Sequence, residues 1–305
     1  MKFVLLFSLY LVFCKSDSLT FQSLNKFLDA RKIDTSNIKI DLYKKNENSS
    51  IYIPKNPDKD RISDFIVSEK EITRIKKKSR DYKTSPLRDD ELVILNTSKG
   101  TIKIKLYNDI APNHCYNFKK LCNSGFYDHT SFHRVVRNFM IQGGDILTRD
   151  KDRDNDGTGS PGWNIDNEFN KINHKRGIVS MARSSDINSA GSQFFICTND
   201  SYFLDEKYTV FGEVVDGMDI VDAISKVPTD RDLRLQTSNV KIPDNEDVNN
   251  WIKVTDYDMK KDLFYKIPIG ENASSFRNLV VKDLRSKNPY RRIEIKKARV
   301  YVQKN

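Results

Sequence analysis

The amino-acid sequence predicts a mainly β fold of the barrel or sandwich class, with two helices. Three observations lead to this class. Apolar and polar residues alternate with a period of two, as they do in strands that bury one face. The strand-like runs are short, and loops rich in Gly and Asp separate them. Between residues 90 and 235, only two segments carry the signals of a helix.

The first two strands are predicted within ELVILNTSKGTIKIKLY, residues 91–107. Ile102, Ile104 and Leu106 alternate with polar residues, so one face of this strand is buried and the other is exposed. Residues 98–100, Ser-Lys-Gly, separate the two apolar runs and mark a hairpin turn.

Two helices and a last strand complete the pattern. The first helix opens at Ala111-Pro112 and continues to about Asn123, because Pro is favoured in the first turn. The second is predicted over 219–226, where the spacing of Ile220, Ile224 and Val227 places them on one face. Period-two alternation resumes at 293–300 and predicts the final strand.

Composition limits the classes of protein that fit. The chain has 305 residues, of which 38% are hydrophobic, and its mean hydropathy of −0.62 indicates a normal core diluted by polar segments. Its 52 Lys and Arg exceed its 42 Asp and Glu by 10, which permits attraction to phosphate or an anionic membrane surface without requiring it. Beyond the N-terminus, no apolar stretch reaches the roughly 18 residues of a membrane span, which excludes a multi-span membrane protein.

The N-terminus is typical of an export signal. Lys2 precedes the apolar run 3–14, which predicts a signal peptide over 1–16 and a protein of the periplasm, cell envelope or secretory compartment. Small serines at 16 and 18 permit ordinary cleavage, whereas Leu11–Cys14 is similar to a loose bacterial lipoprotein box. Lipidation of Cys14 as a membrane tether therefore stays open as an alternative, as does a buried N-terminal helix.

Two further segments stand apart from the predicted strands. Residues 17–88 are polar and rich in lysine, which favours a mostly loose tether with one or two short helices. Its basic run, 74–83, could bind an anionic lipid or nucleic acid, but a solvated surface is favoured and no nucleic acid is expected. An insertion at about 237–289 carries five large aromatic side chains, so we expect partial order there, packed on the main domain.

Three segments, 127–145, 177–183 and 189–197, hold the candidate chemistry. They combine one permanent cation, several amides and large apolar side chains, without a nucleophile beside a base. Such a set suits an uncharged, apolar ligand better than hydrolysis. The run Asp152–Gly157 is similar to the start of a calcium loop, but position twelve would be Trp163 instead of a bidentate Glu, so no metal is expected.

These segments resemble the cyclophilin family of peptidyl-prolyl cis-trans isomerases. The resemblance covers about 90–235 and resumes at 293–302, with three motifs in the family's order and spacing. It implies a cyclophilin-like domain over 89–303, built as a closed eight-stranded antiparallel β-barrel capped by two α-helices, with the insertion before its last strand. It also implies catalysis of rotation about Xaa-Pro bonds in proline-containing polypeptides, without a cofactor. We expect the protein to be a monomer.

The resemblance assigns site residues one by one. Arg134 matches the family's catalytic arginine, and Gln142 matches the amide beside it. The substrate-binding positions are matched by Phe139, Met140, Ala182, Arg183 (chiefly through its backbone), Gln193, Phe195, Phe203, Leu204 and Tyr208.

Two positions depart from the best-known pattern. Phe203 stands where familiar members carry Trp, and Tyr208 stands where they carry His. Because that Trp contributes to binding cyclosporin, we expect weak binding of the drug with activity retained. An alternative function is a proline-peptide-binding scaffold or holdase with incidental isomerase activity, for which the insertion would be the partner surface.

Overall fold

The computed structural model describes residues 43–45, 52–54 and 65–303. The predicted signal peptide with Cys14, and most of the predicted tether, lie outside these residues. Two short strands, β1 (Tyr43–Lys45) and β2 (Tyr52–Pro54), are described before residue 65.

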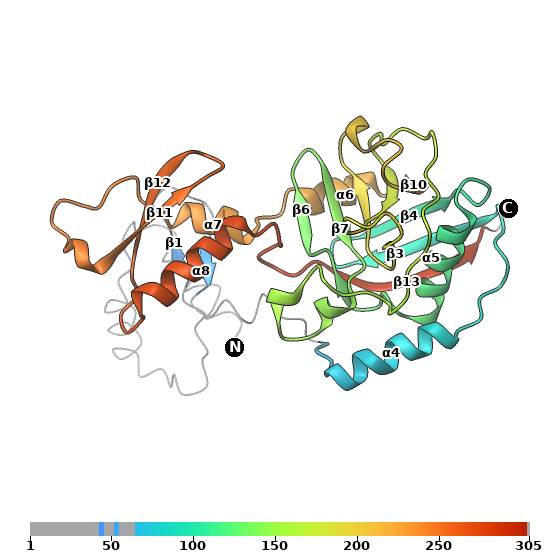
Figure 1. Ribbon diagram of the computed structural model, residues 1–305, viewed down its shortest axis with the longest axis horizontal. Helices are drawn as coiled ribbons and strands as arrows, with labels where there is room; N and C mark the ends of the chain where they lie inside the picture. The colour runs from blue at the N-terminus through green and yellow to red at the C-terminus, as the bar shows by residue number, and fades with distance from the viewer. Residues whose placement is uncertain (1–42, 46–51, 55–64, 304–305) are drawn as a thin grey trace, which may run out of the picture. The chain divides into compact units, whose positions relative to one another are not determined.

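One antiparallel sheet dominates the structure (Figure 1). In the part of the chain that the structure describes, nine strands follow one another across it in the order β5-β13-β3-β4-β10-β8-β9-β7-β6. In chain order they are β3 (Glu91–Thr97), β4 (Thr101–Leu106), β5 (Thr130–Ser131), β6 (Arg134–Val136), β7 (Met140–Gly143), β8 (Ile178–Met181), β9 (Phe194–Cys197), β10 (Val210–Asp216) and β13 (Glu294–Val302). The mainly β class, the first hairpin and the final strand are confirmed.

The strand count differs from the expected eight. The strands at the two ends of the order, β5 and β6, are consecutive in the chain and are separated only by Phe132 and His133. An isolated bridge between Ser131 and Asp145 further joins β5 to the segment after β7. The extra strand arises because one bent segment, 130–136, pairs with β13 through its first residues and with β7 through its last.

The two predicted helices are confirmed. α5 (Pro112–Ser124) has Pro at its first position and ends at Gly125, which adopts a left-handed φ of 83°. α6 (Met218–Ser225) begins one residue before the predicted start. Aromatic rings fill the space under α5, where Phe118 packs against Tyr127, Phe194 and Phe211 with ring centroids 5.0–5.2 Å apart.

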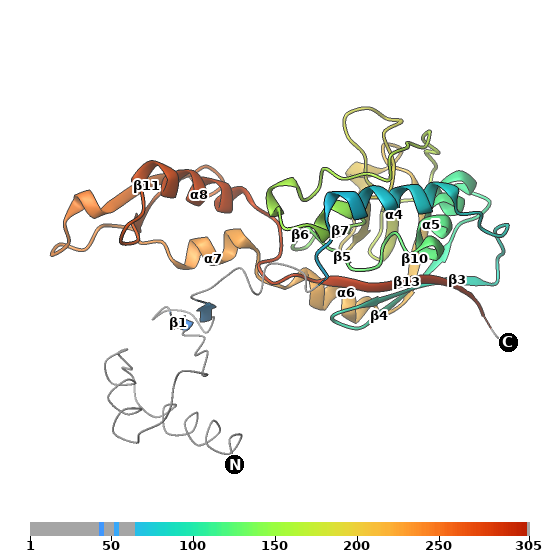
Figure 2. The same ribbon diagram turned by 90° about the horizontal axis from the view of Figure 1, so that it is seen from below.

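A third helix, α4 (Glu69–Asp81), lies within the predicted tether. Ser68 caps its N-terminus by accepting the amide proton of Glu71. Ile72 is buried in the main core, and the hydroxyls of Ser79 and Ser124 lie 2.8 Å apart, so α4 packs beside α5 (Figure 2). This part of the tether is therefore an ordered element of the domain rather than loose chain. Among the described residues, no helix is both long and apolar enough to cross a membrane.

The insertion has its own hydrophobic core. It contains α7 (Asp230–Gln236), η4 (Val248–Asn250), the hairpin of β11 (Trp251–Asp256) and β12 (Lys261–Lys266), and α8 (Ala273–Arg285). The buried members of this hydrophobic cluster are Ile252, Val254, Leu263, Tyr265, Phe276, Val280 and Leu284. Of the five aromatic side chains, Tyr265 and Phe276 thus pack within the insertion's own core and not on the main domain as expected, and Tyr257 is exposed. Because α7 belongs to this body and Thr229 bridges Pro289, the insertion runs from 229 to 289.

Candidate active site

Strand register places three side chains in one row across the outside of the sheet. Arg134 on β6 lies opposite Gln142 on β7, and Gln142 lies opposite Phe195 on β9. Directly opposite residues of antiparallel strands point to the same face, so the cation, the amide and the ring are neighbours. The sequence segments that carry them are separated by 50 residues and meet only through this register.

A chain of hydrogen bonds fixes the polar part of the row. Arg134 donates from Nη1 to Oε1 of Gln142 at 3.1 Å, and Gln142 donates from Nε2 to Oε1 of Gln193 at 3.0 Å. Gln193 in turn donates from Nε2 to the carbonyls of Gly157 and Gly159, each at 2.9 Å. Because each amide has a donor and an acceptor end, this chain sets the orientation of both glutamines and presents an acceptor to the arginine.

Two backbone features hold these strands in place. Asn138 turns the chain from β6 to β7 with a φ of 57°, a left-handed conformation that Asn adopts more readily than most residues. Gly144 follows β7, where an added Cβ would lie 2.3 Å from the carbonyl oxygen of Ser192. Only glycine permits this close approach, which brings Gln193 next to Gln142.

A cluster of apolar side chains, called the apolar pocket below, lies next to Arg134. Four side chains in it are buried: Met140, Phe195, Cys197 and Leu204. Val136, Phe139, Ala182 and Tyr208 surround them and are partly buried. This cluster is separate from the main core, and Met140 Sδ lies 3.8 Å from Nη1 of Arg134.

Phe203 and Arg183 lie at the rim of the pocket. Phe203 is 63% exposed, and its ring centroid lies 5.4 Å from that of Phe139. Arg183 folds back on the protein: its Nη2 donates to the carbonyl of Lys207 at 2.9 Å, and its guanidinium lies 4.7 Å from the ring centroid of Tyr208. The Arg183 side chain therefore supports Tyr208, a role that its place in the sequence motif does not reveal.

A buried polar network supports the pocket from behind. His174 is fully buried. Its Nδ1 lies 2.9 Å from Asp205 Oδ1, its Nε2 lies 3.1 Å from Ser180 Oγ, and its ring stacks on Phe195. Although the three residues are of the types found in serine hydrolases, the Ser180 hydroxyl is buried and donates to the carbonyl of Thr209. The network is a support for Phe195 and not a nucleophile.

Electrostatics at the site favour a single permanent cation. Partial burial lowers the pKa of Arg134 from its ordinary value, but a guanidinium stays protonated at physiological pH. Burial lowers the pKa of His133 to about 4, so this neighbour is neutral. Burial also raises the pKa of the Cys197 thiol to about 12, which leaves it unreactive as a nucleophile.

The aspartates of the calcium-like run contact the protein itself. Asp152 accepts the amide proton of Asp154, Asp154 pairs with Lys282 of the insertion, and Asp156 accepts from Asn288. Among the described residues, no group of three or more His, Cys, Asp or Glu side chains is placed to hold a metal ion.

The structure brings all eleven predicted site residues to one region, either in the polar row, in the pocket or at its rim. Sequence reasoning missed Val136, Cys197 and His174. Val136 could have been found from strand alternation, since it lies two residues after Arg134 and shares its face. His174 gave no local signal, because its partners lie 31 and 6 residues away in the chain.

Comparison with known proteins agrees with this geometry. Residues 92–246 match the family model of the cyclophilin type peptidyl-prolyl cis-trans isomerases. A peptidyl-prolyl cis-trans isomerase of Acinetobacter baylyi is 45% identical over 144 residues, which are 45% of this chain and 73% of that protein. An isomerase-like protein of Rhizopus delemar is 45% identical over 147 residues, or 48% of this chain and 86% of its own.

Other matches are partial. A peptidyl-prolyl cis-trans isomerase of Arabidopsis thaliana is 42% identical over 161 residues, but the match spans only 24% of its length. A solved cyclophilin-type isomerase of Cryptosporidium parvum has a TM-score of 0.48 at 24% identity, and covers 70% of this chain and 99% of its own. The family model matches half of the sequence, and two relatives that are 45% identical are matched over 73% and 86% of their own length. The chain therefore belongs to the cyclophilin-type peptidyl-prolyl cis-trans isomerases.

Proposed function

We propose that Arg134 and the pocket beside it catalyse rotation of the peptide bond that precedes proline. The observation that carries this proposal is the oriented guanidinium, held by Gln142 and Gln193, next to the apolar cluster of Met140, Phe195 and Leu204. A proline ring is small and apolar and fits such a cluster. The same placement leaves the amide nitrogen of that ring within reach of the arginine.

The chemistry follows from amide resonance. The prolyl amide resists rotation by about 18–20 kcal/mol because the nitrogen lone pair is delocalised into the carbonyl. A donor near that nitrogen stabilises its pyramidal form, in which delocalisation is lost. Arg134 supplies the donor, the pocket holds the ring while the carbonyl side turns, and Gln142 hydrogen-bonds the substrate backbone. Because the twisted state is bound more tightly than either planar state, no covalent step is required.

A coupled isomerisation assay on a short Xaa-Pro peptide tests the proposal. We expect Arg134→Ala to lower kcat/KM by at least about 100-fold, in the range found when a donor to a transition state is removed. Arg134→Lys keeps the charge but loses the planar fork, so its rate should lie between the two. Equal rates for wild type and Arg134→Ala, or activity in neither, would sink the proposal.

We further propose that the substrates are exported proteins, and that the enzyme acts as a folding catalyst in the periplasm, cell envelope or a secretory compartment. The support is the basic and apolar N-terminal segment 1–16. Unaided isomerisation takes tens to hundreds of seconds, so a compartment that receives unfolded chains benefits from this activity. Fractionation of cells that produce the full chain would contradict export if the protein, uncleaved, stayed in the cytosol.

Two alternatives at the N-terminus predict different products. Ordinary cleavage near Ser16 gives a free protein, which we propose to be a monomer, whereas lipidation at Cys14 gives a membrane-attached one. Labelling with a radioactive fatty acid distinguishes them: label that persists in Cys14→Ser, or that is absent in wild type, excludes lipidation at Cys14. Light scattering at a mass well above 35.4 kDa would exclude the monomer.

Weak binding of cyclosporin is proposed from Phe203. This residue is exposed at the rim and lacks the indole N–H of the Trp found in familiar members. Phe203→Trp should therefore strengthen inhibition by the drug while turnover of the peptide is retained. Tight inhibition of the wild type would contradict this inference.

A further inference from the structure

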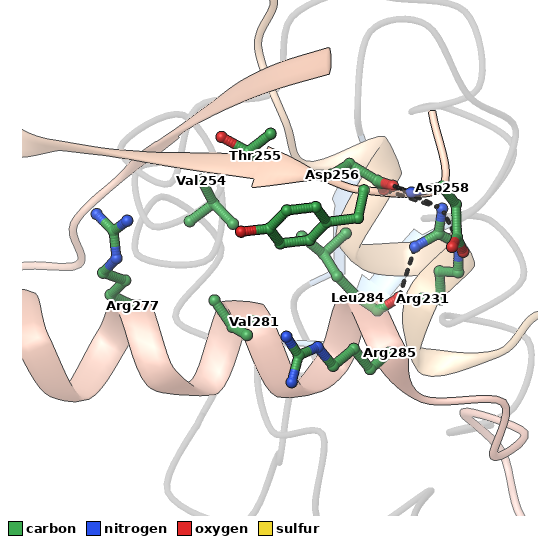
Figure 3. Close-up of a pocket in the computed structure, with 10 residues that line it drawn as sticks. Arg231, Val254, Thr255, Asp256, Asp258, Arg277, Val281, Leu284 and Arg285 are labelled. Atoms are coloured by element: carbon green, nitrogen blue, oxygen red, sulfur yellow. Dashed lines mark hydrogen bonds and ion pairs between the residues drawn. The ribbon is translucent and has the colours of Figure 1, made fainter. Parts of the chain in front are cut away.

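The insertion has a groove of about 430 Å³ between β11 and α8 (Figure 3). Residues of β11 and the turn after it form one wall, and residues of α8 form the other. Figure 3 shows Arg277, Val281 and Arg285 following one another along the side of α8 that lines this groove. The groove belongs to the inserted body and shares no residue with the pocket beside Arg134.

The groove has an apolar floor and two cationic ends. Val254, Val281 and Leu284 contribute to the floor, and Tyr257, which is 77% exposed, adds an aromatic ring at its edge. Arg277 and Arg285 are eight residues apart on α8, which corresponds to about 12 Å along the helix axis. Both are exposed.

The other charges of the groove are already paired. Arg231 lies 2.9 Å from Asp256 Oδ2 and 3.4 Å from Asp258 Oδ2, and it also donates to the carbonyl of Leu284. Lys287, which does not line the groove, lies 3.9 Å from Asp258. In the described part of the chain, by contrast, neither Arg277 nor Arg285 has a carboxylate within ion-pair distance. These two guanidinium groups are the charges that remain for a ligand.

We propose that this groove binds an extended acidic peptide segment with the pattern acidic-x-apolar-x-acidic. Alternate side chains of an extended chain share one face, and four residues span about 13 Å, which matches the separation of the two arginines. The two carboxylates would each meet one guanidinium, which binds carboxylates through two parallel hydrogen bonds. The central apolar side chain would lie over Val281 and Leu284.

The floor of the groove favours a peptide over a nucleic acid. A phosphate backbone has no apolar side chain to bury on Val254, Val281 and Leu284. An acidic peptide that places its apolar residue centrally buries that residue on this floor.

A direct binding measurement on the full chain tests the proposal independently of turnover. The probe is a fluorescein-labelled peptide with the core Glu-Ser-Leu-Ser-Glu, which contains no proline and so is not a substrate of the isomerase site. Fluorescence anisotropy should show saturable binding that weakens as salt rises. Arg277→Gln and Arg285→Gln should each raise Kd about tenfold, as expected for loss of a bidentate charged hydrogen bond.

Matched controls make the result decisive. Lys171→Gln removes one exposed positive charge from the barrel domain and should leave Kd unchanged. Replacement of the peptide's Leu by Ser should weaken binding, since the floor then has no partner. Circular dichroism spectra that coincide with that of wild type show that the arginine variants are folded.

Four outcomes would overturn the proposal. They are the absence of saturable binding, an unchanged Kd in both arginine variants, equal affinity for the Ser-substituted peptide, and tighter binding of a single-stranded oligonucleotide. A fifth outcome concerns a segment of this chain. Residues Asp60-Arg-Ile62-Ser-Asp64 have the same acidic-x-apolar-x-acidic pattern and lie outside the described residues. If Asp60→Asn with Asp64→Asn tightens binding of the probe, that segment covers the groove and the partner is not a separate protein.

Discussion

Gln193 connects the arginine of the site to the loop after β7. Its Nε2 bonds two glycine carbonyls, so its Oε1 is left to orient Gln142, which in turn orients Arg134. Gln193→Leu keeps the size of the side chain but removes both the Oε1 acceptor and the Nε2 donor. We expect kcat to fall about tenfold, a barrier rise of about 1.4 kcal/mol, with KM changed less than about twofold, because the proline pocket is intact.

A double-variant comparison tests whether Gln193 acts through the arginine. If it does, Gln193→Leu should add little to Arg134→Ala, since residues that act as one unit are not additive. Additive losses would show that Gln193 contributes separately, and the positioning role would be wrong.

His133 carries the clearest dependence of stability on pH. Burial lowers its pKa to about 4 in the folded chain, whereas an exposed His has a pKa near 6.5. Between these values the unfolded state binds the extra proton, so the free energy of unfolding rises with pH through this window. The contribution of His133 to the free energy of unfolding is complete above about pH 6.5. About 3 kcal/mol of this contribution is lost as the pH falls toward 4.

Urea unfolding at several pH values measures this effect. His133→Gln should unfold with a flatter dependence on pH between 4 and 6.5, while Asp145, whose pKa is raised by burial, contributes equally to both proteins. Parallel curves for the two proteins would exclude His133 as the cause.

At the scale of elements, the insertion supports the strand that carries Arg134. The carbonyl of Lys287 accepts the amide proton of Val135 at 2.8 Å, on the outer edge of β6. Beside this contact, Arg153 pairs with Asp230 at 3.2 Å, and their side chains are only 11% and 6% exposed. Asp230→Asn should therefore destabilise the contact by about 3 kcal/mol, as expected when one partner of a buried pair is lost.

Hydrogen exchange at the Val135 amide is the measurement. We expect it to accelerate in Asp230→Asn and to stay unchanged in Asp244→Asn, which removes an exposed carboxylate from the same insertion. Equal exchange in both variants would mean that the ion pair does not hold β6.

The elements that the sequence predicts well are those whose signals are local. Alternation over 101–106 and the Pro at 112 are read within a few residues, and β4 and α5 form where they were expected. α7 could not be assigned to the insertion, because Arg234 finds its partner Asp283 49 residues later in the chain. Likewise, the polar sequence of α4 gives no hint that Ile72 is buried in the core. Most site residues were found through family motifs, whereas supports such as His174 depend on long-range packing.

For the molecule as a whole, the structure predicts that the insertion can be removed. Its core is separate from that of the sheet, and the bridge between Thr229 and Pro289 brings its two ends together. Replacement of 231–286 by a short Gly-Ser linker, which keeps Asp230 and Lys287 as supports of β6, should leave a cooperative unfolding transition and isomerase activity within about tenfold of wild type. It should also abolish binding of the acidic peptide. An insoluble or fully inactive product would contradict this separation of the two bodies.

The position of β13 has a consequence for biosynthesis. Only two residues separate Arg134 from β5, and β5 pairs with β13, which is made after all the other described strands of the sheet. A nascent chain that has not yet released residues 294–302 from the ribosome lacks the strand on which β5 is fixed. The sheet is therefore complete only after residues 294–302 have been made, and before that point the enzyme cannot assist the isomerisation of its own earlier prolines.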